Sequence, residues 1–496
     1  GAVVMETVDV ADILEPGAQY GGNVRLSFAS NGETFGRSAT AAGRIGMVEW
    51  LAYARTLTGE DYQAGGGLTV DGSAASLYTR LVKLAFESED GHRLEFSAQQ
   101  MDDDALRPFR ANIISVGSPA LPRRYETLRT SYALSYERIG AEGFWDPRFV
   151  IGHSEVDITV GRPATSYRGV TSTLSATLEN RFHLSPETTI TAGLDYYDRQ
   201  SAFSEDAVAP ITEAARNWGV FAQVRSDPTD ALSLSYGARI DSQRFELADG
   251  QSFSETGVSL NGQADVILSD AWTLNIGLAS TWGGYELSEA SLINLGGPWV
   301  YGTPEPSRAN NARIGLRYDS GPWAVRGALF YTEIEDVNDV LSAARSLATL
   351  TSKGFDGSVA YFAANGYLRM NYTYADVTLD VAPIGSTAYY YGRPVGHMIG
   401  LEGAYALSPQ WVVGGSAEIA LENNDTAVAL PGYEVVNLFA AYSPPGYEQV
   451  ELRLDARNIF NETYAARGSD GIDLPSRIVA LNEPGRTVSL TASLKF

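Results

Sequence analysis

Histidine is the side chain best suited to ligate iron or to move a proton near neutral pH, and the 496 residues contain four. His92 and His183 fall at predicted tight turns, where surface placement is expected, whereas His153 and His397 lie toward the opposite, loop-bearing side. The neutral imidazole of His397 could ligate haem iron; an ordinary histidine at a strand end is the alternative. His397 follows three tyrosines and an arginine, which are Tyr389, Tyr390, Tyr391 and Arg393. The tyrosine rings could stack on a porphyrin or a catecholate, or could join an interfacial girdle.

Two acidic clusters carry the hard oxygen ligands that calcium prefers. They lie in predicted outer loops three and eight and comprise Asp102, Asp103 and Asp104, and Glu333, Glu335, Asp336 and Asp339. Neither has the regular spacing of a calcium-loop motif, so solvated loop charge is the competing interpretation. Arg107 and Arg110 follow the first cluster and could bind an anionic ligand or glycolipid, or be satisfied by the neighbouring acids.

Catalysis is a separate hypothesis, which requires a nucleophile, a base beside it and a third residue that orients the base. The only neighbouring pair is His153 and Ser154, whose side chains would point to opposite faces of a strand. We therefore expect that the chain is not an enzyme.

The composition narrows the class of partner. Acidic residues outnumber basic ones 60 to 36, and the net charge of -24 repels a phosphate backbone, so no nucleic-acid partner is expected. Cysteine is absent, which excludes disulfide scaffolds and Cys-ligated metal centres. Only Lys83, Lys353 and Lys495 are lysines, so 33 of the 36 basic residues are arginines; codon bias and the clamping of glycolipid phosphates are the two interpretations.

The elements that must position these residues are strands. No apolar run approaches the ~18 residues of a membrane-spanning helix, which excludes a helical membrane protein. Apolar and polar residues alternate with period two in segments 232–240, 272–278, 450–457 and 488–496. Alternation alone fits a soluble sandwich or an outer-membrane barrel equally.

The spacing of tight turns distinguishes the two. Ten turns rich in Gly, Pro, Asp and Ser recur about 45 residues apart, which leaves room for two tilted strands of ~10 residues and one long loop. Ten short periplasmic turns and eleven long extracellular loops predict an all-β fold, a 22-stranded antiparallel transmembrane β-barrel. The turns are residues 44–47, 88–92, 139–144, 184–187, 226–230, 269–272, 319–323, 363–367, 406–411 and 443–448.

Aromatic residues gather at the predicted strand ends, as in the interfacial girdles of membrane barrels. Any single one of them could equally be a packing residue, so only their number supports the barrel. They include Tyr196, Tyr197, Trp218, Trp272, Trp282, Trp323 and Trp411.

The carboxy-terminal region carries a family resemblance. Residues 432–471 read GYEVVNLFAAYSPPGYEQVELRLDARNIFNETYAARGSDG, and residues 483–496 read EPGRTVSLTASLKF. This resembles the terminal signature of TonB-dependent outer-membrane receptors, including the stretch Asn458 to Tyr464 and the terminal aromatic Phe496. The resemblance implies a 22-stranded barrel filled by an amino-terminal plug domain, with Phe496 as an assembly signal read by the barrel-assembly machinery.

Residues 1–18, GAVVMETVDVADILEPGA, resemble the end of that plug and the hinge into the barrel, so that residues 19–496 form the barrel itself. The plug and the TonB box before it are then essentially missing from this chain. Three explanations stay open: a plug cleaved or omitted, a plug supplied as a separate chain, or a natural plugless pore. A 22-stranded lumen is too wide for its own side chains to fill.

The hinge resembles haem and haemoprotein receptors of the family more than ferric-siderophore receptors. Those receptors usually carry a histidine in the seventh long loop, between two conserved boxes. The corresponding segment, 282–318, has the general shape of that loop but contains no histidine, which puts a conventional haem ligand there in doubt. Its candidate ligand-binding residues are Tyr285, Glu286, Glu289 and Tyr301.

Taken together, the resemblance implies an integral protein of the Gram-negative outer membrane that binds haem or a ferric siderophore in its loops and passes it through a plug-gated barrel energised through TonB. It implies no permanently bound cofactor, lipopolysaccharide as a neighbour, and a surface lipoprotein as a further partner. A plugless or partner-plugged pore or scaffold is the alternative. The lumen residues expected to face the plug are Glu451, Arg453, Asp455 and Arg457.

Overall fold

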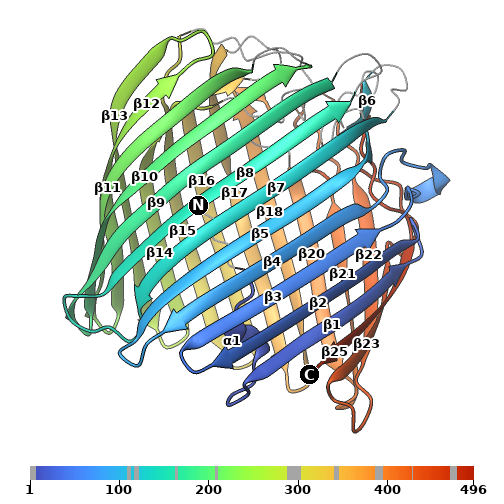
Figure 1. The fold of residues 1–496 in the computed structure, drawn as a ribbon. Helices are drawn as coiled ribbons and strands as arrows, with labels where there is room; N and C mark the ends of the chain where they lie inside the picture. The colour runs from blue at the N-terminus through green and yellow to red at the C-terminus, as the bar shows by residue number, and fades with distance from the viewer. Residues whose placement is uncertain are drawn as a thin grey trace.

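The structure is a computed structural model that describes residues 7–108, 113–116, 122–161, 166–206, 210–287, 303–339, 346–385, 395–426, 428–469 and 478–496. Within these ranges the chain forms a cylinder whose antiparallel strands are tilted relative to its long axis (Figure 1). No helix in these ranges is long and apolar enough to cross a membrane.

Twenty-two strands of the described chain close the cylinder, which confirms the predicted fold. The first eleven are β1 (Tyr20–Ala29), β2 (Thr34–Ile45), β3 (Val48–Thr58), β4 (Ser76–Glu87), β5 (His92–Arg107), β7 (Arg123–Arg138), β8 (Pro147–Gly161), β9 (Ser166–Ser185), β10 (Thr188–Glu205), β11 (Ile211–Thr229) and β12 (Leu232–Glu246).

The second half of the wall continues in the same order around the cylinder. It consists of β13 (Ser252–Ser269), β14 (Trp272–Gly284), β15 (Ser307–Ser320), β16 (Trp323–Asp339), β17 (Ser346–Ala363), β18 (Gly366–Leu379), β20 (Gly396–Ala406), β21 (Trp411–Ala420), β22 (Tyr433–Tyr442), β23 (Val450–Arg457) and β25 (Thr487–Lys495).

Five short elements of the described chain are not among these twenty-two strands. The two-residue strand β19 (Ala382–Pro383) pairs with β18, and β6 (Ile113–Val116) pairs with β24 (Ile478–Ala480). A single helical turn, α1 (Val10–Ile13), begins at the side-chain cap of Asp9, and a 3-10 turn covers Gly65–Gly67.

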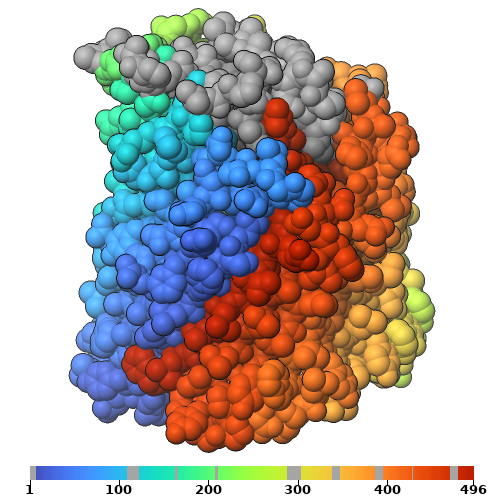
Figure 2. All heavy atoms as spheres, turned by 90° about the vertical axis from the view of Figure 1, so that its right-hand side faces the viewer, coloured from blue at the N-terminus to red at the C-terminus, as the bar shows by residue number. Residues whose placement is uncertain are grey.

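The first and last strands close the barrel. Register pairs run from Asn23 opposite Lys495 to Ala29 opposite Ser489, and Figure 2 shows the first strands in blue against the last in red. Beyond β25, the amide of Phe496 donates to the Gly22 carbonyl at 3.0 Å, and the Phe496 carbonyl accepts from the Gly22 amide at 2.8 Å. A Cβ on Gly22 would lie 2.6 Å from the Phe496 ring, so only glycine fits beneath it.

The two faces of the wall follow from the alternation. Large apolar side chains such as Leu278, Leu368 and Leu490 are exposed on the outer face, where lipid takes the place of a core. On the inner face, Asn371 and Thr373 of β18 border a hollow of the lumen. Closure leaves no sheet edge in the membrane, where an unpaired backbone group could find no water.

All ten predicted turns join neighbouring strands at one end of the cylinder. Aromatic pairs mark this end on the outer face: Trp272 with Tyr318, Trp323 with Tyr361, and Trp411 with Tyr442, with ring centroids 4.6 to 4.8 Å apart. These pairs form a girdle of the kind that sits at a membrane interface.

The connections at the other end differ from the eleven long loops expected from the sequence. Residues 30–33 suffice to join β1 to β2, and residues 247–251 join β12 to β13. The extra chain is contained in the strands instead, since β9 has 20 residues and β11 has 19. Strands of this length extend past a membrane that ~10 residues can span.

Candidate functional site

Two clusters of aromatic side chains face inward at the loop end of the barrel, which we call the mouth. The first surrounds Tyr285, just beyond β14, whose ring stacks on Phe245 of β12 at 5.5 Å between centroids. The Tyr285 hydroxyl donates to Glu255 at 3.2 Å, and its amide donates to the side-chain oxygen of Gln243 at 2.7 Å. Burial and then the Glu255 carboxylate raise the pKa of Tyr285 to about 12, so its phenol is neutral at pH 7.

The second mouth cluster lies on β20 to β22 and on the segment after β23. Tyr433 donates to Glu418 at 2.6 Å, and its ring centroid lies 4.6 Å from that of Tyr464. Met398 and Tyr464 both pack against the buried cluster of Ala420, Tyr433 and Val435. Burial, then Glu483 and Glu418, raise the pKa of Tyr464 to about 12. No described residue hydrogen-bonds the Tyr464 hydroxyl.

Arg467 is a buried cation beside the second cluster. It is 3% exposed, its backbone amide donates to the Tyr433 hydroxyl at 3.3 Å, and Nη2 donates to the Leu421 carbonyl at 2.5 Å. Its Nε has no partner, and no described carboxylate forms an ion pair with it. Desolvation accordingly lowers the pKa of Arg467. A buried charge without a counterion is costly, so the position favours an anion.

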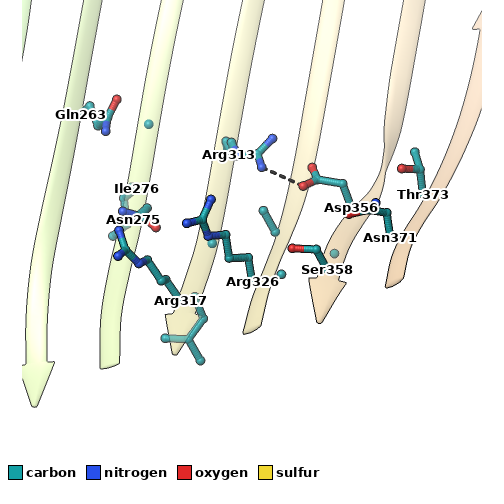
Figure 3. Close-up of a pocket in the computed structure, with 16 residues that line it drawn as sticks. Gln263, Asn275, Ile276, Arg313, Arg317, Arg326, Asp356, Ser358, Asn371 and Thr373 are labelled. Carbon is teal, nitrogen blue, oxygen red and sulfur yellow. Dashed lines mark hydrogen bonds and ion pairs between the residues drawn. The ribbon is translucent and has the colours of Figure 1, made fainter. Parts of the chain in front are cut away.

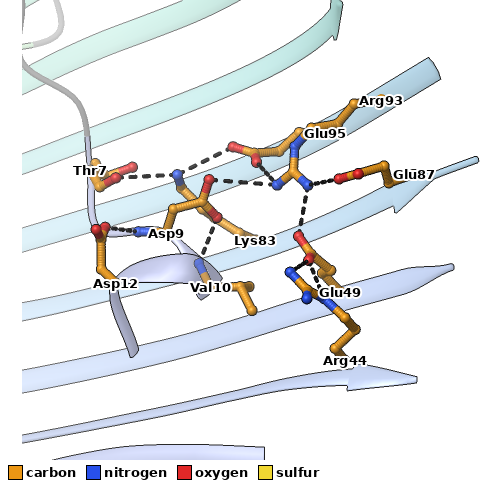
Figure 4. A network of polar contacts seen from close by, with 10 residues as sticks. All are labelled: Thr7, Asp9, Val10, Asp12, Arg44, Glu49, Lys83, Glu87, Arg93 and Glu95. Carbon is orange, nitrogen blue, oxygen red and sulfur yellow. Dashed lines mark hydrogen bonds and ion pairs between the residues drawn. The ribbon is translucent and has the colours of Figure 1, made fainter. Parts of the chain in front are cut away.

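A second polar centre lies inside the lumen at the tight-turn end, around Arg93 (Figure 4). The guanidinium contacts four carboxylates at 2.7, 3.0, 2.9 and 3.5 Å, those of Glu49, Glu87, Glu95 and Asp9. Lys83 lies 3.2 Å from Glu95 and donates to the carbonyl of Thr7 at 3.3 Å. Below these contacts, Val10 packs on Ala42, Leu51 and Leu81, so the amino-terminal segment is held against the lumen wall.

His397 lies on the outer face of the barrel. Its ring stacks on that of Tyr374 at 4.4 Å, and its Nδ1 lies 2.7 Å from the Tyr372 hydroxyl. Both tyrosines share a face of β18 with the exposed Leu368 and Met370. His397 therefore points away from the lumen. Its position is that of a residue in an interfacial girdle, not that of a residue facing a ligand inside the barrel.

The first acidic cluster lies in β5 rather than in a loop. Asp103 points inward to Arg107, whose Nε donates at 3.1 Å, while Asp104 points outward to Arg124 at 2.6 Å. Asp102 shares the outward face, because alternate residues of a strand take opposite sides. The run therefore diverges instead of forming one cation site.

The second acidic cluster lies in β16. Glu333 and Glu335 share the outer face, and Glu333 accepts a hydrogen bond from Tyr331 at 2.9 Å. Asp336 follows with a positive φ of 56° at a bulge. In the described part of the chain no three acidic or histidine side chains converge as a metal site would require.

The other predicted residues fall into two groups. Arg107 donates to the carbonyls of Gly72 and Ala74 at 3.3 and 2.6 Å, so it ties a loop to β5. Glu286 follows Tyr285 at the mouth. The remaining predicted positions lie outside the described residues; they are Arg110, Glu289, Tyr301, Tyr389, Tyr390, Tyr391, Arg393 and the side chain of Asp339.

The charged residues of β23 lie on the lumen face, opposite the exposed Leu452 and Leu454. Arg453 pairs with Asp455 at 2.9 Å and stacks on the Phe439 ring at 3.9 Å. Glu451 and Arg457 continue the same face by alternation. Their role against a plug is untested by these contacts and stays a prediction.

Sequence reasoning missed the Arg93 network, the Tyr433 and Tyr464 pair, and Arg467. One signal was available for the network: the charges at Lys83, Glu87, Arg93 and Glu95 occupy alternate positions on either side of one tight turn. The others could not be found, because Tyr433 and Arg467 are 34 residues apart and meet only in the closed barrel.

Known proteins similar to this chain are transporters and receptors. The heme transporter BhuA of Brucella abortus is 27% identical over 524 aligned residues, which cover all of this chain and 77% of that protein, and its counterpart in Brucella suis matches equally. The FrpB iron transporter from Neisseria meningitidis superposes with a TM-score of 0.87 at 19% identity, covering 99% of this chain and 83% of that one. The hemophore receptor HasR of Serratia marcescens, in complex with its hemophore HasA and heme, superposes at 0.76 and 15% identity, covering 99% and 82%.

A family model described as "TonB dependent receptor-like, beta-barrel" matches residues 16–459, which is most of the chain. Together with the closed 22-stranded wall, the match identifies the chain as an outer-membrane β-barrel protein of a Gram-negative bacterium. The chain belongs to the TonB-dependent receptor family.

Proposed function

We propose that this barrel takes up haem through the outer membrane, with the cargo first bound at the mouth and its passage energised through TonB. The observation that carries the proposal is the similarity to haem transporters along the whole of the chain. FrpB is likewise named as an iron transporter, and HasR as a hemophore receptor in complex with its hemophore and heme.

The mouth has the chemistry that a porphyrin requires. The half-buried ring of Tyr464 is a flat aromatic surface on which a porphyrin could stack. A tyrosine phenol is a known haem-iron ligand, and Tyr464 is a phenol without a hydrogen-bond partner among the described residues. The unpaired cation of Arg467 suits a carboxylate of the same cargo.

The amino-terminal segment supports gating by a plug. Residues 7–14 lie inside the lumen and are fixed to β2 through β5 by the Arg93 network and by the packing of Val10. A plug domain joined to this segment, or supplied separately, would therefore lie beside the same wall. The further partners that we propose are lipopolysaccharide around the outer face, the barrel-assembly machinery at Phe496, and a surface lipoprotein.

A growth assay tests the cargo. The full-length gene product would be expressed in a Gram-negative strain that makes no haem and lacks its own haem receptors. Growth on haemin that depends on an intact TonB gene is the expected result. A second strain, which makes haem, tests a ferric siderophore as the iron source. If the protein supports growth only in this second assay, the cargo is a ferric siderophore and not haem.

A binding assay tests the mouth. Haemin added to the purified protein is expected to give a Soret band that weakens in Tyr464→Phe. Tyr447→Phe is the matched control, because Tyr447 is exposed at a tight turn on the far end. An unchanged Soret band in Tyr464→Phe would remove this residue from the site.

A further inference from the structure

An apolar hollow of about 380 Å³ lies on the outer face of the barrel, across β13 to β16; we call it the outer hollow. Two small residues, Gly262 and Ala312, form its floor, and larger side chains surround them. These larger side chains are exposed to the outside and belong to Leu260, Leu278 and Tyr331. The outer hollow is therefore a recess in the surface that contacts membrane lipid.

The outer hollow and the lumen lie on opposite sides of the same strands. Gln263 and Arg313 line a separate hollow inside the lumen (Figure 3). Because neighbouring residues of a strand take opposite faces, Gly262 and Ala312 face outward. A plug inside the barrel therefore does not cover the outer hollow.

The floor of the outer hollow is open. A Cβ on Gly262 would meet no atom within 4 Å. Leu260 and Leu278, on either side of it, are 56% and 62% exposed, so they present apolar side walls. An acyl chain lying between these walls would bury more apolar surface than one lying on an even part of the barrel.

Arg308 is fixed at the end of the outer hollow nearer the mouth. Its Nη1 donates to the Ser280 hydroxyl at 3.0 Å and to the Val258 carbonyl at 3.2 Å, and Ser280 itself lines the hollow. Glu335 is opposite Arg308 in the ladder, yet the guanidinium turns toward β14 instead. Its Nε and Nη2 form no hydrogen bond or ion pair with the residues that the structure describes. Two nitrogens of the guanidinium are therefore available to an anion.

The level of Arg308 in the wall is that of a lipid head group. Tyr318 belongs to the aromatic girdle at the tight-turn end. A tilted strand crosses the hydrocarbon layer with ~10 residues, which is the separation of Arg308 from Tyr318 on β15. Arg308 consequently lies at the interface on the mouth side, and the outer hollow lies below it, among the acyl chains.

We propose that the outer hollow and Arg308 form a binding site for one lipopolysaccharide molecule, with a lipid A phosphate on Arg308 and an acyl chain in the hollow. A guanidinium fork matches the oxygens of a phosphate. The mouth side of an outer-membrane barrel faces the outside of the cell, and lipopolysaccharide forms that leaflet. The inference rests on the lipopolysaccharide neighbour of the proposed function, and it is independent of the haem cargo.

Lipid A is the probe, titrated into the purified protein in mild detergent and counted by native mass spectrometry. Arg308→Gln is expected to lower the affinity for lipid A at least fivefold. The matched control is Arg168→Gln on the outer face of β9, because Arg168 already has a carboxylate partner, Asp157, at 2.6 Å. Its lipid A affinity should stay within twofold of wild type. Equal losses in the two variants would mean a general effect of surface charge and would overturn the site.

A second variant fills the outer hollow and leaves Arg308 in place. Gly262→Leu adds a side chain where a Cβ has free space, so the barrel should keep its unfolding temperature while its affinity for lipid A falls at least fivefold. Haemin-dependent growth should be unchanged in Gly262→Leu, so the lipid site and the cargo are tested separately. Lipid A binding at wild-type strength in this variant, or equally tight binding of phosphatidylglycerol by the wild-type protein, would refute the proposal.

Discussion

The Arg93 guanidinium lies 2.7 Å from the Glu49 carboxylate, at the centre of the contacts that fix the amino-terminal segment inside the barrel. The two side chains are 11% and 5% exposed, so water screens them little. Removing one partner of a buried pair leaves the other charge uncompensated, which costs more than the pair itself contributes.

We therefore expect Arg93→Gln to lower the free energy of unfolding by about 3 kcal/mol. Urea unfolding in detergent, followed by tryptophan fluorescence, measures the loss. Arg369→Gln is the control, because its pair with Glu402 is about 40% exposed on both sides and should contribute less than about 1 kcal/mol. Equal destabilisation by the two substitutions would contradict a special role for Arg93.

Tyr62 gives the barrel a dependence on alkaline pH. Its hydroxyl donates to the carbonyl of Asn482 at 2.7 Å, joining two loops at the mouth, and burial followed by Glu483 raises the pKa of Tyr62 to about 12 from 10.0. Between pH 10 and 12 the unfolded chain loses this proton and the folded chain keeps it. Stability from this group is thus complete below pH 10 and declines as the pH rises toward 12.

Tyr62→Phe should accordingly flatten the decline, by up to about 1.4 kcal/mol per pH unit in that window. Unfolding free energies measured at intervals from pH 9 to 11.5 give the slope. Tyr447→Phe, at an exposed turn position, serves as the reference. A slope that is the same in Tyr62→Phe and wild type would show that this phenol does not titrate late.

The fold could be predicted from the sequence because strand alternation and turn spacing are local signals. The lengths of the connections at the mouth were harder to predict from the sequence. A polar segment beyond the membrane resembles a loop in sequence even when it continues the strand pairing, as it does in β9 and β11. The divergence of Asp102, Asp103 and Asp104 was available from alternation once the strand was known to include them. The face of the barrel on which His397 lies could not be predicted in this way. His397 is at the end of a strand, and its face is set by the register in which that strand pairs with β18.

His397 provides a test of that register. Because it stacks on Tyr374 on the outer face, His397→Ala should leave haemin affinity within twofold of wild type, whereas Tyr464→Phe weakens it. Soret titrations of the two variants side by side make the comparison. A loss in His397→Ala as large as that in Tyr464→Phe would place the imidazole at the cargo and contradict the outward orientation.

The stretch from Asn458 to Tyr464, which carries the family signature, has a structural explanation at its first residue. Asn458 is 3% exposed, and its side-chain amide donates to the carbonyls of Glu462 and Pro484 at 2.9 and 3.2 Å. Its side-chain oxygen accepts from the Glu462 amide at 2.8 Å. The backbone has a positive φ of 46°, which asparagine tolerates better than most residues.

Two substitutions separate the side-chain contacts from the backbone. Asn458→Gly keeps the positive φ but loses three hydrogen bonds, so it should cost about 2 kcal/mol. Asn458→Ala loses the same bonds and adds about 1 kcal/mol of backbone strain. Unfolding in urea should therefore rank wild type above Asn458→Gly, and Asn458→Ala last. An alanine variant as stable as wild type would mean that these bonds do not hold the end of β23, and that the signature is retained for another reason.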